Sequence, residues 1–499
     1  MTYACKLTEI PKHQCPDLIQ FYSHFPHKYP YLFTSSSQSA SSSADQESSQ
    51  FDILFIEPEQ WLKLDHQKQL SSSPNINFAE DGSFLDNFDR LFFAEEESTE
   101  QAIESELPFT GGWFMFLAYE LAQQVEPCLK LTFEKQLLPI AYAARVKKAL
   151  IYDHKKECLF FMTESDMDHQ RHYQSLLADM QFICQQSSKS TETDVFNFPI
   201  VEETADSFLI AVDTVKSYIK EGDVFQVNLS RLWQSTLSKK NNNQKHTEQV
   251  AVLSQLLAQE NPAPFSGVAS FNSELCNSKE GEVSIVSSSP ERLLRVKNKR
   301  LESRPIAGTR PRSTSLEEDL RLLKELHDHP KEQAEHIMLI DLIRNDLGRV
   351  CKPGSVVVDE LMVNETYAHV HHIVSNVSGE LQTGKTPGEI LKAMFPGGTI
   401  TGCPKVRCME IIAELEQCSR GAYTGSMGYI NLDGSMDFNI LIRTFVIESL
   451  LDNLLEESAQ RLSFRAGAGL VFDSIAEKEL HETRAKAKGL LQALKAELK

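Results

Sequence analysis

Carboxylates on two predicted helices are the first candidates for chemistry. In HPKEQAEHIMLIDLIRND, Pro330 suits a first helical position. Glu335 then shares one helical face with Leu339 and Leu342. A carboxylate on an apolar face is costly to bury unless a cation meets it. The pattern therefore indicates a buried charge with a cationic partner.

A second carboxylate pair lies near the C-terminus. In SIAEKELHETRAKAKGLLQAL, the residues Glu479, Glu482 and Lys486 fall on one face of a predicted helix. A hard divalent cation such as Mg²⁺, completed by water and substrate oxygens, would suit a pairing of Glu335 with Glu482. Surface ion pairs are the alternative, and for the C-terminal helix taken alone they are favoured.

Three glycine stretches could present backbone N–H groups to an anion. They are AGT (307–309), PGGT (396–399) and AGAG (466–469). A tight turn is the simpler interpretation of each stretch alone. None matches the GxxxxGK[ST] nucleotide loop, because Lys405 follows Pro404, and no GxGxxG clearly follows a strand. A nucleotide is therefore not expected.

Cationic and polar residues lie near these glycines: Lys405, Arg407, Arg443 and Tyr429. Arg443 falls in the apolar, strand-like run FNILIRTF, where a buried guanidinium favours a bidentate carboxylate partner. That partner could be a substrate or a structural ion pair. His372 lies in the predicted strand AHVHHIVSNV, and a packed, hydrogen-bonded histidine is its more ordinary interpretation.

The elements that must position these residues divide at about residue 195. The chain has 499 residues, enough for two or three domains or for one large one, and 41% of them are hydrophobic. Residues 1–195 are rich in strand patterns. Residues 196–499 begin with an amphipathic helix over about 204–221 that ends at Gly222, and strands and helices then alternate.

Charge and cysteine content limit the partners and the compartment. The net charge of -20 argues against nucleic-acid binding. Ten cysteines without a CxxC pair predict reduced thiols in a cytoplasmic protein. The sequence has no apolar run near twenty residues and no signal-peptide pattern, so neither membrane insertion nor export is expected.

Taken in order, nine segments resemble the chorismate-utilising enzymes. They are GDVFQVNLSR, SSSPERLLRV, SRPIAGTRPR, AEHIMLIDLIRNDLGRV, AHVHHIVSNVSGEL, FPGGTITGCPKVRCMEIIAELE, GSMGYINLDGSMDFNILIRTF, RAGAGLVFDS and ELHETRAKA. They cover the chain from about residue 204 to the end, and GGWFMFLAYEL resembles the N-terminal glycine motif of the family. The resemblance implies a two-lobed α+β fold, with large, mainly antiparallel sheets packed together and helices outside. Residues 1–195 would complete the core, and 196–499 would form the chorismate-binding catalytic domain.

The resemblance also implies a role for each site residue. Glu335 and Glu482 would hold Mg²⁺ on the ring carboxylate of chorismate, with Glu332 and Glu479 beside them. The enolpyruvyl carboxylate would be held by Tyr429, Arg443 and the backbone of Gly467, Ala468 and Gly469. Further pocket residues would be Lys405, Lys486, Gly308 and Thr309. Glu291 of SPER would be the general acid/base, and His372 corresponds to the active-site histidine of the family.

Gln226 in VFQVNL indicates which nucleophile attacks. Family members that add water carry lysine at this position, and a carboxamide cannot deprotonate water. The residue therefore favours ammonia. No cysteine lies in a G-x-C-x-G elbow, so the resemblance implies a separate glutamine amidotransferase subunit as the ammonia source.

Two ammonia-using enzymes remain. The segments FPGGTITGCPKVR, VHHIVS, RGAYTGSMGY and FDILFIEP look more like aminodeoxychorismate synthase component I than anthranilate synthase component I. Ala307 in PIAGT favours anthranilate synthase instead, because many aminodeoxychorismate synthases carry a nucleophilic lysine at this position. Lys405 is a conceivable substitute nucleophile. A non-catalytic relative that binds chorismate or tryptophan is a further alternative, and tryptophan could bind the N-terminal lobe.

Overall fold

The computed structural model describes most of the chain. The described residues are 5–35, 50–74, 76–96, 106–134, 136–186, 199–238, 245–276, 281–313, 315–366, 370–452 and 457–495.

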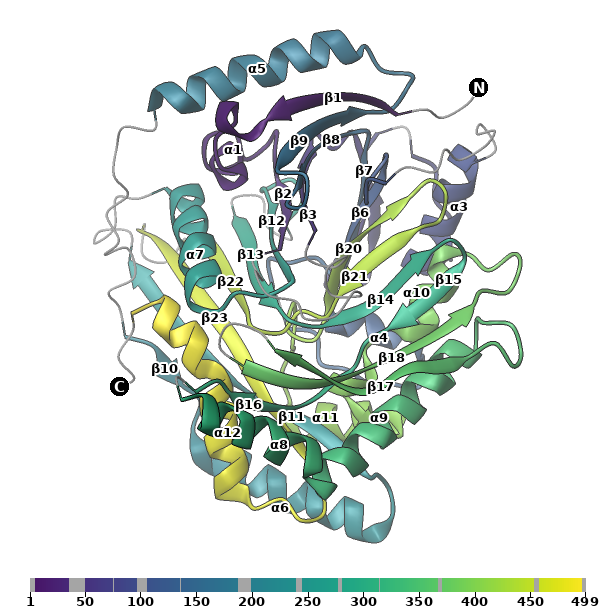
Figure 1. Ribbon diagram of the computed structural model, residues 1–499, viewed down its shortest axis with the longest axis vertical. Helices are drawn as coiled ribbons and strands as arrows, with labels where there is room; N and C mark the ends of the chain where they lie inside the picture. The colour runs from purple at the N-terminus through teal and green to yellow at the C-terminus, as the bar shows by residue number, and fades with distance from the viewer. Residues whose placement is uncertain are drawn as a thin grey trace.

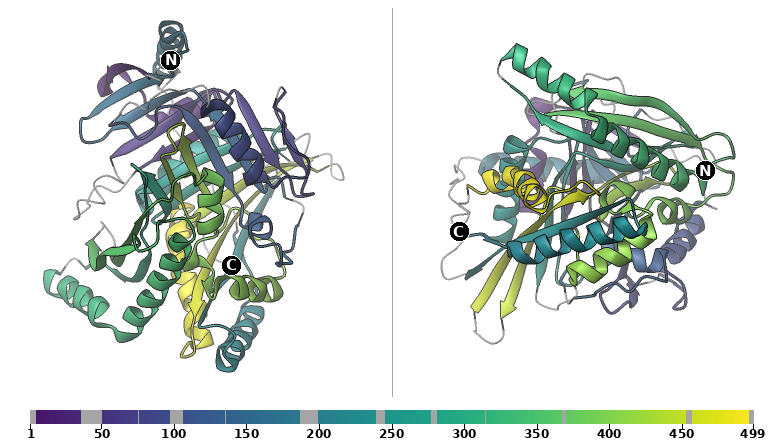
Figure 2. Two further views of the ribbon diagram at one scale, coloured as in Figure 1. Left: turned by 90° about the vertical axis from the view of Figure 1, so that its right-hand side faces the viewer. Right: turned by 90° about the horizontal axis from the view of Figure 1, so that it is seen from below.

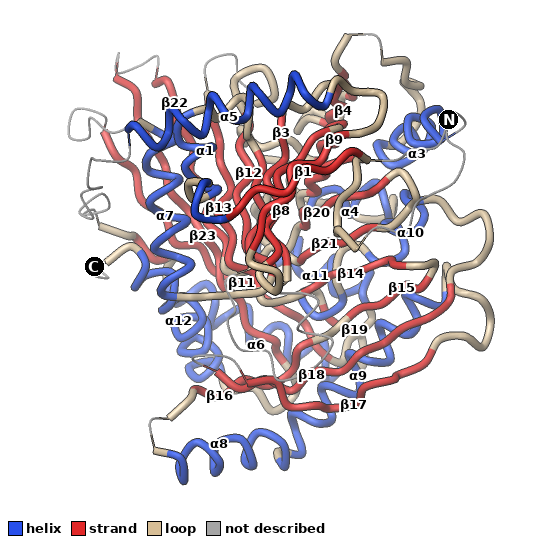
Figure 3. The backbone as a smooth tube through the Cα atoms, turned by 45° about the horizontal axis from the view of Figure 1, so that its top comes forward, coloured by secondary structure: helices blue, strands red, loops and turns tan. Residues whose placement is uncertain are grey.

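Two large antiparallel sheets form the centre of the molecule, and helices surround them (Figures 1 and 3). In order across the first sheet, the strands are β1 (Lys6–Pro11), β9 (Cys158–Thr163), β8 (Lys148–Asp153), β3 (Phe51–Ile56), β2 (Tyr31–Thr34), β12 (Phe265–Phe271), β13 (Glu282–Ser289), β22 (Thr444–Asp452), β23 (Glu457–Leu470), β11 (Gln226–Ser238) and β10 (Val201–Glu202). The short strand β19 (Gly402–Cys403) also pairs with β11. The predicted α+β fold with mainly antiparallel sheets is confirmed.

The second sheet carries several of the predicted site residues. Its strands, in order, are β16 (Ile306–Pro311), β18 (Val370–Glu380), β15 (Arg300–Ser303), β14 (Arg292–Lys297), β21 (Met436–Asn439), β20 (Ser426–Asn431), β6 (Gly112–Leu117), β7 (Ala141–Val146), β4 (Gln60–Leu64) and β5 (Leu70–Ser72). A further strand, β17 (Val357–Thr366), pairs with β18.

The helices lie mainly on the outer faces. They are α1 (Leu18–His24), α3 (Phe84–Glu96), α4 (Ala122–Val125), α5 (His169–Gln186), α6 (Ala205–Glu221), α7 (His246–Glu260), α8 (Leu316–Asp328), α9 (Pro330–Gly348), α10 (Pro387–Met394), α11 (Lys405–Glu416) and α12 (Ala476–Ala493). Short 3-10 turns are η1 (Lys12–Gln14), η2 (Tyr119–Leu121) and η4 (Gly398–Ile400). Within the described ranges, no helix is both long enough and apolar enough to cross a membrane.

Local sequence explains where key helices begin and end. The predicted helix over 204–221 is α6, and it ends at Gly222, whose φ of 86° is left-handed and suits glycine. Pro330 occupies the first turn of α9, as predicted, where its missing N–H costs no helical hydrogen bond. A capping box formed by Thr386 and Glu389 begins α10.

Both halves of the sequence contribute to both sheets. The N-terminal strand β2 pairs with β12, and β6 pairs with β20. The two sheets pack through an apolar core that contains Tyr31, Phe114 and Met427. The boundary predicted near residue 195 lies outside the described residues, and the strands on either side of it do not separate into different sheets.

The two predicted carboxylate helices pack on different sheets. α9 lies on β16 and β18 of the second sheet, whereas α12 lies on β23 of the first. Figure 2 shows both helices from below, α9 in green and α12 in yellow. Any ligand held by both helices would therefore bridge the two sheets.

Candidate active site

A buried carboxyl, Glu291, lies at the centre of the candidate site. It follows β13 and is only 5% exposed. Burial raises the pKa of Glu291 to about 7, although the Thr399 hydroxyl, the Ile306 N–H and the charges of Lys486 and Arg443 each favour its ionised form. Glu291 therefore retains a proton near neutral pH, as a general acid requires.

His372 is the second buried titratable group of the site. It lies in β18, as predicted, and pairs in register with Thr309 of β16. Burial and the charge of Arg443 lower the pKa of His372 to about 3, although the imidazole also hydrogen-bonds to the backbone of Gly308. The ring N–H donates to the Gly308 carbonyl, because only that contact favours the protonated form. His372 is therefore neutral and fixed in orientation.

Arg443 has a different backbone from the one predicted. It does not continue a strand but lies between β21 and β22 with a φ of 51°, in the left-handed region. Its Nη1 donates to Asn261 Oδ1 at 3.1 Å, and its carbonyl accepts from the Ser288 N–H. Burial lowers the pKa of Arg443, and the Glu291 carboxyl opposes that shift. Within the described part of the chain it has no direct carboxylate partner, so a ligand carboxylate could pair with it.

Lys405 is engaged by a carboxylate of the protein. It begins α11, and its Nζ donates to Asp346 Oδ2 at 2.6 Å. Burial raises the pKa of Asp346. Asp346 lines the same small cavity as Glu291 and Thr399. The sequence assigned Lys405 directly to the substrate pocket; the structure shows its ammonium group bound to Asp346 at the edge of that cavity.

Two of the three predicted glycine loops are strands. Gly308 lies in β16, and Gly467 and Gly469 lie in β23. Their role is close approach rather than turning: a Cβ on Gly308 would lie 1.6 Å from Glu332 Oε2, and a Cβ on Gly467 would lie 2.6 Å from the Tyr423 hydroxyl. The ladder between β23 and β22 ends at Phe464, so the segment with Gly467, Ala468 and Gly469 pairs with β11 alone.

The structure places Tyr423, and not Tyr429, next to Gly467. Tyr429, in β20, packs against Phe55 and Phe109 in the core between the sheets. Tyr423 lies in the turn before β20, and its hydroxyl approaches Gly467. The alternation of SMGYIN could have shown the difference, because Tyr429 shares the face of Met427, an apolar residue of the intersheet core.

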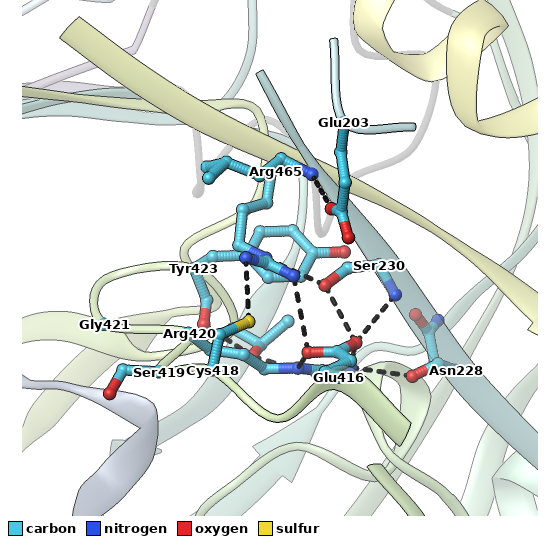
Figure 4. A network of polar contacts seen from close by, with 12 residues as sticks. Glu203, Asn228, Ser230, Glu416, Cys418, Ser419, Arg420, Gly421, Tyr423 and Arg465 are labelled. Atoms are coloured by element: carbon cyan, nitrogen blue, oxygen red, sulfur yellow. Dashed lines mark hydrogen bonds and ion pairs between the residues drawn. The ribbon is translucent and has the colours of Figure 1, made fainter. Parts of the chain in front are cut away.

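A network of charged and polar side chains lies beside Tyr423 (Figure 4). Glu416 accepts from Arg420 Nη2 at 2.6 Å and from the Ser230 N–H at 2.8 Å. Although burial alone would raise it, Arg420 and Arg465 hold the pKa of Glu416 below its usual value. The Arg420 guanidinium lies 5.6 Å from the centre of the Tyr423 ring. Glu416 and Arg420 form an i,i+4 pair that the sequence could have indicated. Ser230 and Arg465 come from strands far away along the chain, so the full network could not be predicted from spacing.

The four predicted metal ligands remain on their two helices. Glu332 Oε1 pairs with Arg310 at 2.7 Å, and Glu335 is partly buried on α9. Glu479 is buried, whereas Glu482 is exposed and pairs with Lys486 at 2.8 Å. That contact is the surface ion pair named as the alternative. The described residues contain no group of three or more His, Cys, Asp or Glu side chains placed to hold a metal.

Comparisons with known proteins agree with this architecture. A family model described as chorismate binding enzyme matches residues 35–492. The chain is 43% identical over 395 residues to an anthranilate synthase component I-like protein of Synechocystis sp., covering 79% of this chain and 74% of that protein. It is 38% identical over 414 residues to aminodeoxychorismate synthase component 1 of Bacillus subtilis, covering 81% and 82%.

Solved structures show the same fold. Anthranilate synthase component I from Streptococcus pneumoniae superposes with a TM-score of 0.70 at 29% identity, covering 88% of this chain and 92% of that one. The menaquinone-specific isochorismate synthase MenF of Escherichia coli gives a TM-score of 0.63 at 17% identity, covering 99% and 95%, which supports the fold alone. From the matched family model, the relatives and the shared fold, we conclude that the chain belongs to the chorismate binding enzyme family.

Proposed function

We propose that the chain is aminodeoxychorismate synthase component I. It would aminate chorismate with ammonia to give 4-amino-4-deoxychorismate, the precursor of 4-aminobenzoate and folate. The observation that carries the proposal is the buried Glu291, with its pKa raised to about 7, beside Arg443 and the neutral His372. A protonated carboxyl can assist departure of a ring hydroxyl, which is the bond cleavage that amination needs.

Chorismate has two carboxylates, and the site offers separate cations and donors for them. Arg443, buried without a carboxylate partner in the described ranges, would hold the enolpyruvyl carboxylate. The Tyr423 hydroxyl and the β23 backbone at Gly467 would donate to the same group. Lys486 and the β16 backbone at Gly308 and Thr309 would line the remainder of the pocket. His372, which is neutral, would lie beside the chorismate ring.

The proposal includes Mg²⁺, which the carboxylates of α9 and α12 would hold. Glu332 Oε2 is shielded from solvent and accepts no hydrogen bond from the described residues, and Glu335 and Glu479 each also bury one carboxylate oxygen. Such oxygens are the ligands Mg²⁺ prefers. Glu335 and Glu482 would hold the ion, with Glu332 and Glu479 beside it. When bound, the ion would stabilise negative charge on the ring carboxylate as hydroxide departs.

Gln226 supports ammonia as the nucleophile. Its carboxamide is buried beside Gly469 and cannot act as the base that would activate water. The proposal therefore includes a separate glutamine amidotransferase subunit that supplies ammonia, and a cytoplasmic location for the pair. All ten cysteines are free thiols, which is compatible with that compartment.

Anthranilate synthase component I is the alternative, favoured by Ala307 and by the anthranilate synthase relatives. Product analysis separates the two. The purified chain is incubated with chorismate, Mg²⁺ and an ammonium salt. We expect a product that a lyase converts to 4-aminobenzoate. Blue-fluorescent anthranilate with release of pyruvate would reject the proposal in favour of the alternative. Absence of any turnover would favour a non-catalytic binder.

Tryptophan could bind in a second cavity, between the two sheets. This cavity is lined by Phe33, Phe51, Phe265 and Tyr429, with the Asp437 carboxylate at its wall. Aromatic walls suit an indole ring. The Asp437 carboxylate already pairs with Arg292 through two hydrogen bonds of 2.9 and 3.0 Å, so an α-ammonium group would have to share it. Calorimetric titration of the purified chain with tryptophan tests this, and an unchanged signal with Tyr429→Ala would remove the cavity from consideration.

A further inference from the structure

Two carboxamide side chains lie next to each other on β11, beside the glycines of β23. Gln226 and Asn228 alternate along the strand, so they point to the same face of the sheet. A Cβ on Gly469 would lie 2.6 Å from Gln226 Nε2, and a Cβ on Gly467 would lie 2.7 Å from Asn228 Oδ1. The missing side chains of the two glycines therefore provide the space that the carboxamides occupy.

The oxygen atoms of these carboxamides have no donor. Gln226 Oε1 and Asn228 Oδ1 are both shielded from solvent, and the described part of the chain supplies no hydrogen bond to either. Ser230, the next residue on the same face, is satisfied, because its hydroxyl donates to Glu416 at 2.9 Å. Buried acceptors without donors are destabilising and uncommon, and two adjacent ones indicate a ligand that donates.

The backbone beneath these side chains is held firmly. The Asn228 N–H donates to the Thr401 carbonyl at 2.9 Å, and Arg420 Nη2 donates to the Asn228 carbonyl at 2.8 Å. The Gln226 carbonyl accepts from the Cys408 thiol at 3.0 Å. The carboxamides are thus presented on a rigid strand, which suits the positioning of a small ligand.

A ligand that donates hydrogen bonds to Gln226 Oε1 and Asn228 Oδ1 must differ chemically from chorismate. The carboxylates of chorismate only accept hydrogen bonds, and its one hydroxyl is the leaving group assigned to Glu291. Ammonia has three N–H donors and one lone pair. If two of its hydrogens bond to two fixed oxygens, the lone pair remains available for attack.

One short segment links this position to the proton donor. Thr399 lines the same small cavity as Glu291, the Thr401 carbonyl accepts from the Asn228 N–H, and Cys403 pairs in register with Gln226. The segment from 399 to 403 therefore links the cavity of Glu291 to the strand that carries Gln226 and Asn228.

We propose that Gln226 Oε1 and Asn228 Oδ1 form the acceptor pair that binds ammonia for attack on the ring. This inference rests on the proposed function. In the step, a nitrogen–carbon bond forms and a ring carbon–oxygen bond breaks. The hydroxyl leaves as water with a proton from Glu291, and the nitrogen gives up one proton in return. The net change is chorismate plus ammonia to aminated product plus water.

Substitution of Asn228 tests the pair, with ammonium salt as the varied substrate. Asn228→Leu removes the acceptor at nearly constant volume. It should raise the KM for ammonia about tenfold, while the KM for chorismate changes less than twofold. Asn228→Asp keeps an acceptor and should retain an ammonia KM close to that of the parent chain. Thermal denaturation of each variant checks folding, and Asn228→Ala replaces the leucine variant if that one does not fold.

Asn376→Leu is the matched control. Asn376 is a strand asparagine whose Oδ1, like that of Asn228, is shielded from solvent and has no donor among the described residues. It lies in β18, and its Nδ2 donates to Asp359. Its loss should leave the KM for ammonia unchanged. An unchanged ammonia KM in Asn228→Leu, equal increases in both KM values, or an aspartate variant as impaired as the leucine variant would each overturn the inference. A parent chain that produces no aminated product would instead overturn the proposed function and this inference with it.

Discussion

Two tyrosines six residues apart occupy opposite kinds of surroundings. Tyr423 lies beside Gly467 and the charged network of Glu416 and Arg420. Tyr429 lies among phenylalanine rings between the sheets. Burial raises the pKa of both tyrosines, so neither ionises near neutral pH. Burial alone therefore does not identify a substrate site, because one of these tyrosines is buried beside charged groups and the other in an apolar core.

The largest effect should come from Glu291→Gln, the substitution of the buried carboxyl near Arg443. Removal of the proton donor should lower the turnover of chorismate by roughly 10²- to 10⁴-fold. The variant should be at least as stable as the parent at pH 8, because burial raises the pKa of Glu291 and thus penalises its ionised form in the folded state above the unfolded value. Steady-state kinetics measure the turnover, and thermal denaturation measures the stability. Undiminished turnover would remove Glu291 as the acid.

Loss of one carboxylate on α9 should weaken Mg²⁺ binding. Glu335→Gln should lower the apparent affinity for Mg²⁺ by roughly 10- to 100-fold, because a neutral amide is a poorer ligand for a hard cation. Asp341→Asn is the matched control, since Asp341 is exposed on the same helix and pairs with Arg344. Titration of activity with Mg²⁺ after removal of metal by chelation compares them. Equal responses would count against α9 as the metal helix.

The paired substitutions Tyr423→Phe and Tyr429→Phe test the comparison directly. A hydrogen bond to a charged group contributes about 1.5 to 3 kcal/mol, so Tyr423→Phe should lower kcat/KM for chorismate by roughly 10-fold or more. Tyr429→Phe should change it less than about twofold. Chorismate saturation curves decide the matter, and the reverse ranking would restore Tyr429 to the substrate site.

Glu291 should also set the pH dependence. Activity that needs its protonated form should be constant below the pKa of about 7 and fall as pH rises above it. The expected slope is about tenfold for each pH unit on the alkaline side. The midpoint is measured from kcat/KM for chorismate against pH, with the concentration of un-ionised ammonia held constant, because ammonium has no lone pair for attack. A decline that begins near pH 4.5 would show that burial does not raise this pKa.

The smallest effect should come from Arg407→Ala. Arg407 lies near the glycine segment in the sequence, but the structure pairs it with Asp223 at 2.7 Å and with Glu410 at 3.0 Å on a partly exposed surface. Partly exposed pairs contribute little, so activity should change less than about twofold. A large loss of activity in the same assay would show that Arg407, in the first turn of α11, contributes to the active site.

Local patterns predicted several elements correctly. The helix ending at Gly222, the proline at the start of α9 and the strand around His372 each follow from spacing within one segment. Other features depend on partners that are distant in the sequence. The glycines 467 and 469 form a strand because β11, more than two hundred residues away, pairs with them. Lys405 is bound by Asp346 from another helix.

Residue types at short spacings were enough to predict the family, the α+β class and the candidate residues Glu291, His372, Arg443 and the helix carboxylates. The packing of the folded chain was needed to show that Tyr423 and not Tyr429 approaches Gly467, and that both halves of the chain build both sheets. The physical reason is that periodicity defines which side chains share a face. Which partner covers that face depends on packing between segments far apart along the chain.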